Sequence, residues 1–254
     1  MKFFKSLFGR KASPEVQSFD APLAPEEAFF VIGDLHGCLT EFEDLVEVIE
    51  AKSETPKLVC VGDYVDRGED VARLLKRLFQ LNSDFPRHFI CLKGNHEDML
   101  LKFLSDPEQY GPRWLRHGGL QTLASYGVGR QTGDTQSQLA QQLSYAMGAE
   151  LIDWIKRLPL SWTSGNVTVT HAGADPSVPI DAQAAKTLLW GHPDFLKLDR
   201  QDGQWVVYGH VIQEHGLATQ GTIAVDTGAY ATGVLTAAHI EKDVVSFLTN
   251  RASR

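Results

Sequence analysis

The sequence predicts an α/β fold centred on a mostly parallel sheet. Three apolar runs of the buried-strand kind, AFFVIGD, KLVCVGD and RHFICLKGN, occur in its first hundred residues. Each run is followed by a segment whose apolar residues have helical spacing. Strands that alternate with helices in this way favour right-handed crossovers within one sheet. A chain of 254 residues can bury a sizeable core in a single domain.

Each predicted element follows from its local pattern. Thr40 and Glu43 fit a capping box for the first helix, which carries apolar residues at i, i+3, i+4 and i+7 from Phe42. The same spacing from Val71 predicts the second helix, and EDMLLKFL starts the third. Residues 105–160 are predicted to be helical and to shape substrate access. Five later strands are predicted in NVTVTHAG, QWVVYGH, TIAVDTG, GVLTAAHI and DVVSFL.

The first 26 residues are predicted to be a disordered tail, since their basic and aromatic start gives way to Pro- and Ser-containing sequence. A weak membrane contact through Phe3, Phe4, Leu7 and Phe8 is the alternative. No apolar run reaches membrane-spanning length, so stable membrane insertion is not expected.

Composition narrows the classes of function. The formal net charge of -8 and the lack of a long basic stripe argue against nucleic-acid binding. The three cysteines, Cys38, Cys60 and Cys91, are odd in number and lack zinc-finger spacing. Cys60 and Cys91 fall within apolar runs, as buried free thiols do, so a reducing cytoplasm is predicted.

Polar residues collect where the predicted strands end. GDLHG, GDYVDRG and GNHE follow the first three strands, and HAG and GH follow two later ones. Ligands bind beyond the carboxyl ends of parallel strands, so these clusters are expected to converge. Asp34 and His36 can reach one ion, because residues i and i+2 of an extended chain point to the same side. Carboxylates and imidazoles without thiolates suit Mn, Fe or Zn, and a bridging Asp63 could hold two ions about 3.5–4 Å apart.

The first three motifs resemble the signatures of the phosphoprotein phosphatase family of metallophosphoesterases, in its bacterial and phage-type serine/threonine phosphatase branch. HAG and YGH resemble the later histidine motifs, and DTG at residues 226–228 resembles the closing segment of bacterial members. The resemblance runs from Gly33 to about Gly228. It implies a four-layer αββα sandwich, a single calcineurin-like domain over residues 27–250 and a dimetal centre at the carboxyl ends of the strands.

The resemblance also implies two divalent ions, with Mn²⁺ expected and Fe or Zn as alternatives, held by six side chains. Those side chains are Asp34 and His36 for the first ion, Asp63 as the bridge, and Asn95, His171 and His210 for the second. A metal-activated hydroxide would attack phosphorus in line. His96 would protonate the leaving oxygen, Asp66 would orient His96, and Arg67 would clamp the phosphate, which Asn95 would also bind.

One departure from the family pattern concerns the phosphate clamp. Many relatives carry a second arginine in a W-x-R segment, whereas this chain reads LLWGHPDFL around Trp190. His192 is the predicted substitute for this arginine, and Arg200 or Arg113 could serve instead. The remaining alternative is that no residue replaces it and the affinity for phosphate is weaker. The departure leaves the substrate range open.

The first functional expectation is a protein serine/threonine phosphatase that acts on phosphoproteins or phosphopeptides. The main alternative is a dinucleoside polyphosphate (diadenosine tetraphosphate) hydrolase or a broad-specificity phosphoesterase with the same metal centre. Symmetrical diadenosine tetraphosphatases resemble this chain in GDxHG, but their pattern lacks the acid-support pair and prefers GNHD. Asp66, Arg67 and Glu97 therefore favour the protein phosphatase, although Glu97 is interpreted as a helix N-terminal carboxylate. A non-catalytic phosphate-binding scaffold is the second alternative.

Overall fold

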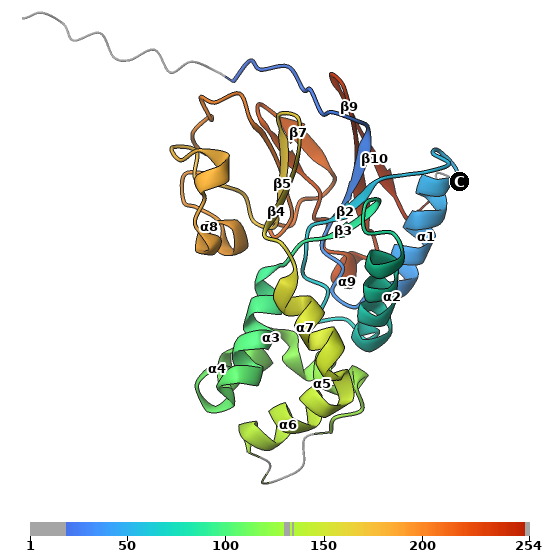
Figure 1. Cartoon of the computed structure of the whole chain (residues 1–254), viewed down its shortest axis with the longest axis vertical. Coiled ribbons are helices and arrows are strands. Elements are labelled where there is room, and N and C mark those ends of the chain that lie inside the picture. The colour runs from blue at the N-terminus through green and yellow to red at the C-terminus, as the bar shows by residue number, and fades with distance from the viewer. Residues whose placement is uncertain (1–18, 130–132, 134, 252–254) are drawn as a thin grey trace, which may run out of the picture.

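Two five-stranded sheets form the centre of the molecule in a computed structural model that describes residues 19–129, 133 and 135–251 (Figure 1). The first sheet has the order β10 (Val244–Thr249), β9 (Thr236–Glu241), β1 (Phe29–Ile32), β2 (Leu58–Cys60), β3 (Phe89–Cys91). The second has the order β4 (Ser161–Ser164), β5 (Val167–Thr170), β6 (Trp205–Tyr208), β8 (Thr222–Ala224), β7 (Leu217–Thr219).

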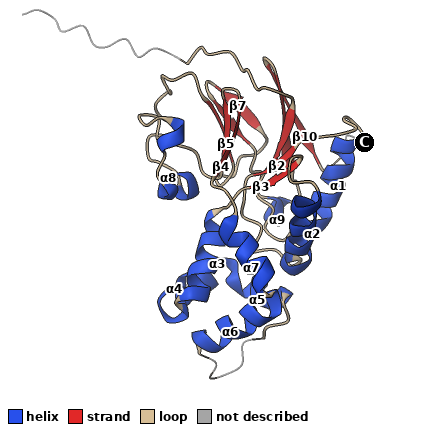
Figure 2. Cartoon of the chain, in the orientation of Figure 1, coloured by secondary structure: helices blue, strands red, loops and turns tan. Residues whose placement is uncertain are grey.

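Helices cover the outer faces of both sheets, so the expected αββα arrangement is confirmed (Figure 2). α1 (Leu39–Glu50) and α2 (Val71–Asp84) cover the first sheet, and α8 (Ala185–Trp190) with a short 3₁₀ helix (Ile180–Ala182) lies beside the second. A helical lobe extends from one end of the sheets. Its members are α3 (Asn95–Ser105), α4 (Pro107–Trp114), a π-helical turn (Leu115–Gly119), α5 (Leu120–Ser125), α6 (Gln136–Met147) and α7 (Ala149–Arg157). The last helix is α9 (Ala229–Thr232). Within the described ranges, no helix is both long and apolar enough to cross a membrane.

The continuous apolar sequence of β1 is explained by burial on both of its faces. Phe30 and Ile32 pack with the residues of α1 and α2, whereas Phe29 and Val31 belong to the cluster between the two sheets. Successive side chains of a strand point to opposite faces, so a strand covered on both sides is apolar throughout.

The sheet pairing brings the predicted motifs to one edge. β1, β2 and β3 are parallel neighbours, and so are β5, β6 and β8. Each of these six strands therefore ends on the same side of its sheet, and the polar motifs follow those ends. The predicted parallel βα units are confirmed.

Two local details differ from expectation. α1 begins at Leu39 with Cys38 at its cap and no side-chain cap, so the capping box of Thr40 and Glu43 does not form. The helix therefore begins two residues before Glu41, the first helical residue that a Thr40 cap would give, and Leu39 is buried in its first turn.

Ordered structure also begins before residue 26, because Phe19 packs edge-on against Trp205 on the second sheet. Residues 1–18, which include the predicted membrane-contacting residues, lie outside the described residues.

Glu97 connects the turn after β2 to the start of α3. Its buried carboxylate accepts backbone N–H bonds from Asp63 and Gly94, both at 2.8 Å, and from Tyr64 and Val65, at 2.7 and 3.2 Å. The interpretation of Glu97 as a helix N-terminal carboxylate is therefore incomplete, because three of its four donors belong to the GDYVDRG turn. One side chain holds two of the predicted motifs together.

Replacing Glu97 with Gln should destabilise the protein by about 2–4 kcal/mol, because the amide group turns one acceptor oxygen into a donor that faces N–H groups. Urea denaturation measures the free energy of unfolding. Glu50→Gln, an exposed change on α1, is the control and should have an effect within about 0.5 kcal/mol. Equal stabilities of the two variants would contradict this role of Glu97.

Candidate metal centre

The predicted metal ligands come together at the carboxyl ends of the strands. Two overlapping groups have ligand atoms within 4.8 Å of one another: His36, Asp63 and His96 in one, and Asp63, His171 and His210 in the other. Asp63 is common to both groups. A carboxylate in this position can face two ions at once, as the bridging expectation requires.

Asp34 and Asn95 adjoin these groups. Both carboxylate oxygens of Asp34 lie 3.1 Å from the backbone N–H of His210, which donates to them. Asn95 Oδ1 lies 2.7 Å from His171 Nε2. Glycines permit this crowding, because a Cβ at position 94 would overlap Asp63 Oδ1. All six predicted ligands therefore lie in one cluster, together with His96.

The backbone of the cluster is strained. The non-glycine residues with positive φ in the described ranges are His36, Asp63, Asp66, Arg67, His210 and Asp243. Five of these six are predicted site residues. Left-handed conformations cost of order 1 kcal/mol or more at non-glycine positions and concentrate where function requires a fixed side-chain direction.

Two buried histidines are prepared to act as neutral ligands. His36 Nδ1 lies 2.7 Å from the Val65 carbonyl, which can only accept, so Nδ1 carries the proton and Nε2 presents its lone pair to the cluster. His171 Nδ1 lies 3.2 Å from the Val61 carbonyl and its Nε2 lies 2.7 Å from Asn95 Oδ1, so the position of its proton depends on the orientation of the Asn95 amide. Burial lowers the pKa of His36 to about 3 and that of His171 to about 4.

The charge balance of the cluster fits divalent cations. Asp34, Asp63 and Asp226 are all buried, and no lysine or arginine in the described ranges forms a salt bridge with them. Burial, followed by repulsion from the other two carboxylates, raises the pKa of Asp34, and burial raises that of Asp226 to about 6. Buried like charges require a compensating positive charge, which metal ions would supply. Asp226 had no predicted role beyond its motif.

His96 and Asp66 form the predicted acid pair. His96 Nδ1 lies 2.6 Å from Asp66 Oδ2. Asp66 also accepts bonds from Trp114 Nε1 at 3.0 Å and from Thr122 Oγ1 at 2.7 Å. Burial alone would lower the pKa of His96, but the carboxylates of Asp63 and Asp66 raise it overall. Trp114 and Thr122 were not predicted as site residues, because their 48- and 56-residue separations from Asp66 give no local signal.

Arg67 lies at the open side of the cluster. Its Nη2 is 3.2 Å from His96 Nε2, and its guanidinium lies 4.8 Å above the ring of Tyr230, which is 39% exposed. The backbone N–H of Arg67 donates to the Gly118 carbonyl in the π-helical turn. The helical lobe thus sets the direction of the predicted phosphate clamp. Tyr230 is a further residue that the motifs did not identify.

His192 contacts a different part of the chain. Its Nε2 lies 3.5 Å from Asp175 Oδ2, and its Nδ1 accepts the backbone N–H of Asp194. These contacts do not join it to Arg67 or to the six predicted ligands, so its predicted role in phosphate binding gains no support from them. Arg200 is buried against Asp202 and the carbonyls of Asp175 and Val178.

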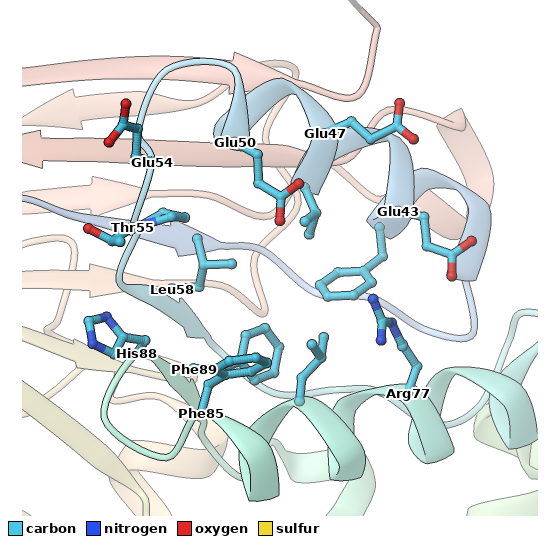
Figure 3. Close-up of a pocket in the computed structure, with 14 residues that line it drawn as sticks. Glu43, Glu47, Glu50, Glu54, Thr55, Leu58, Arg77, Phe85, His88 and Phe89 are labelled. Atoms are coloured by element: carbon cyan, nitrogen blue, oxygen red, sulfur yellow. The ribbon is translucent and has the colours of Figure 1, made fainter.

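A separate groove lies between α1 and α2, with a cavity volume of about 630 Å³ (Figure 3). Leu58 and Phe89, which begin β2 and β3, contribute to its lining, and Glu43, Glu47 and Glu50 lie along its rim. The groove is therefore at the amino ends of these strands, opposite the metal-ligand cluster. It contains none of the predicted site residues.

Several known proteins are similar to this chain. A symmetrical bis(5'-nucleosyl)-tetraphosphatase of Marinomonas sp. is 33% identical over 178 residues, which are 69% of this chain and 54% of that protein. The asymmetrical bis(5'-nucleosyl)-tetraphosphatase PrpE of Oceanobacillus iheyensis is 27% identical over 242 residues, 85% of this chain and 90% of that protein. The chain thus spans about half the length of the first relative and most of the second.

These relatives correct two expectations, that the enzyme is a protein serine/threonine phosphatase and that its substrates are phosphoproteins or phosphopeptides. Both relatives are named as tetraphosphatases. The physical reason lies in the residues that favoured the protein phosphatase. Asp66 holds His96, and Glu97 accepts backbone N–H bonds. Both side chains are fully buried and support chemistry common to phosphoesterases, so they do not select a substrate.

Solved structures share the fold. The crystal structure of a protein assigned as a diadenosine tetraphosphatase has a TM-score of 0.62 and 21% identity, and covers 91% of this chain and 98% of its own. A serine/threonine phosphatase of Saccharomyces cerevisiae has a TM-score of 0.60 and 18% identity, and covers 91% and 82%. The sequence model of the calcineurin-like phosphoesterases matches residues 28–214, which include all six predicted metal ligands. The chain belongs to the calcineurin-like phosphoesterase family.

Proposed function

We propose that this protein is a metal-dependent hydrolase of dinucleoside polyphosphates such as diadenosine tetraphosphate. The observation that carries the proposal is the similarity over 242 residues to a tetraphosphatase, of which the chain covers 90%. The symmetrical tetraphosphatase of Marinomonas sp. supports the same substrate class from a second subfamily. The cluster of carboxylates, imidazoles and Arg67 supplies the groups that hydrolysis of a phosphoanhydride requires.

The metal ligands are proposed to be Asp34, His36, Asp63, Asn95, His171 and His210. Two divalent ions held there would polarise the phosphoryl group and activate water. Mn²⁺ is proposed as the native metal, because the ligand set combines carboxylate and amide oxygens with imidazole nitrogens and contains no thiolate.

His96 and Arg67 are proposed to act on the substrate directly. The Arg67 guanidinium can donate two parallel N–H bonds to phosphoryl oxygens, on which negative charge accumulates in the transition state. The carboxylates of Asp63 and Asp66 raise the pKa of His96, which would donate the proton that the leaving oxygen acquires. A nucleotide phosphate is a better leaving group than a serine alkoxide, so this proton matters less for the anhydride.

Diadenosine tetraphosphate and a phosphoserine peptide should be assayed side by side with purified, manganese-loaded protein. Chromatography separates two molecules of ADP, the products of symmetrical cleavage, from AMP and ATP, the products of asymmetrical cleavage. Hydrolysis of the dinucleotide with a clearly higher kcat/KM than that of the peptide supports the proposal. Hydrolysis of p-nitrophenyl phosphate without turnover of the dinucleotide overturns it.

Asp63→Asn should reduce both metal content and activity, because the amide cannot bridge two cations as a carboxylate does. We expect fewer than two ions per chain by inductively coupled plasma mass spectrometry, and kcat about 10³-fold lower. Asp243→Asn is the matched control, since Asp243 shares a left-handed backbone but lies in the turn between β9 and β10. Full activity of Asp63→Asn would exclude the proposed bridge.

His96→Asn should make the rate more sensitive to the leaving group, because the variant lacks the proton donor. Hydrolysis of phenyl phosphate should fall by about 10²-fold or more, while hydrolysis of p-nitrophenyl phosphate, with its more stable leaving anion, should fall less. Steady-state kinetics on the two esters measure this ratio. His88→Asn, an exposed change in the groove between α1 and α2, is the control. Equal losses on both esters would argue for a structural role of His96.

The protein is also proposed to work in a reducing cytoplasm, because all three cysteines are buried and free. Activity recovered by cell fractionation should be in the cytoplasmic fraction. Recovery in the membrane or secreted fraction would contradict this location.

A further inference from the structure

A dinucleoside polyphosphate carries more anionic phosphates than the one that the metal-ligand cluster and Arg67 would hold, so a further cation would favour its binding. The phosphoryl group that is attacked lies at the cluster, but the remaining phosphates of the chain are also anionic and must lie outside it. Arg200 cannot serve them, because its guanidinium is 5% exposed and is occupied by Asp202 and two backbone carbonyls.

Arg113 is a cation outside the metal-ligand cluster that is free to bind a further phosphate. It is exposed on α4, and its guanidinium lies 4.8 Å from the centre of the Trp190 ring. Within the described ranges its side chain has no hydrogen bond or ion pair to a carboxylate. Stacking uses the face of a guanidinium and leaves the N–H groups at its edge available to donate. A planar fork held in this way is suited to phosphate oxygens.

Each half of this stack is linked to the metal-ligand cluster through neighbouring residues. Trp114, which follows Arg113 directly, donates to Asp66, and the next turn supplies the Gly118 carbonyl that accepts from Arg67. Trp190 ends α8, the helix whose Leu188 carbonyl accepts from Ala172, the residue after His171. Figure 1 shows α4 and α8 on the same side of the molecule.

We propose that Arg113 and Trp190 form a second phosphate-binding subsite, which takes the phosphates of a dinucleoside polyphosphate beyond the one held at Arg67. This inference rests on the proposed function and deepens it. Trp190 is the tryptophan of the segment that lacks the W-x-R arginine, and Arg113 brings a positive charge to that segment from a different element of the fold. Trp190 holds the guanidinium in place, and its indole offers a flat surface beside the phosphates.

Arg113→Gln tests the subsite through the difference between a long and a short substrate. KM for diadenosine tetraphosphate should rise about tenfold, since one charge-assisted contact is lost, while kcat changes little. KM and kcat for p-nitrophenyl phosphate should stay at the wild-type values, because this ester has no further phosphate. Trp190→Ala should raise KM for the dinucleotide in the same way, and Trp190→Phe, which keeps an aromatic face, should raise it less.

Arg77→Gln is the matched control, because Arg77 is exposed on α2 and lines the groove at the opposite edge of the sheet. It should leave both substrates unaffected. If wild-type protein hydrolyses the dinucleotide and Arg113→Gln keeps the wild-type KM, the subsite is excluded and the proposed function stands. If wild-type protein hydrolyses p-nitrophenyl phosphate but not the dinucleotide, the proposed function fails before the subsite is tested.

Discussion

The buried carboxylate of Asp63 is the interaction on which the site depends. It lies within 4.8 Å of ligand atoms from both histidine groups, and its Oδ1 accepts the backbone N–H of His96 at 2.9 Å. Glu97 holds the backbone of Asp63 in place by accepting its N–H. Asp63 therefore joins the ends of strands from both sheets to the start of α3. Three histidines lower the pKa of its carboxyl, although burial alone would raise it, so the carboxylate remains ionised.

The strained backbone and the buried carboxylates of the metal-ligand cluster have a common explanation in metal binding. Left-handed residues, crowded glycines and three buried carboxylates without a lysine or arginine partner in the described ranges would each destabilise a fold that had no use for them. Dense hydrogen bonding around the turn holds them in place: Glu97 fixes the GDYVDRG backbone, and Asp66 accepts from Trp114 and Thr122. The surrounding structure thus stabilises an arrangement that cations would stabilise further.

The residues proposed for hydrolysis and the residues proposed for substrate choice lie on different elements of this fold. The residues proposed to perform hydrolysis follow strand ends within the segment that matches the calcineurin-like phosphoesterase family, whereas the residues proposed to bind further phosphates come from the helical lobe and α8. This separation explains why the Asp66, Arg67 and Glu97 motifs did not distinguish a protein phosphatase from a tetraphosphatase. Arg113 and Trp190, which are proposed to face a substrate beyond the reacting phosphate, belong to the helical lobe and α8.

The sequence by itself determined the parallel βα units, the six metal ligands as candidates and the acid group, because strand periodicity and short motifs are local signals. It did not determine which residues hold Asp66, why Arg200 is unavailable or that Arg113 stacks on Trp190. Those facts depend on contacts between separate parts of the chain, up to 77 positions apart for Arg113 and Trp190, and only the tertiary packing creates them. Local patterns specify the elements and the chemistry, whereas tertiary packing decides which charges remain free to meet a substrate.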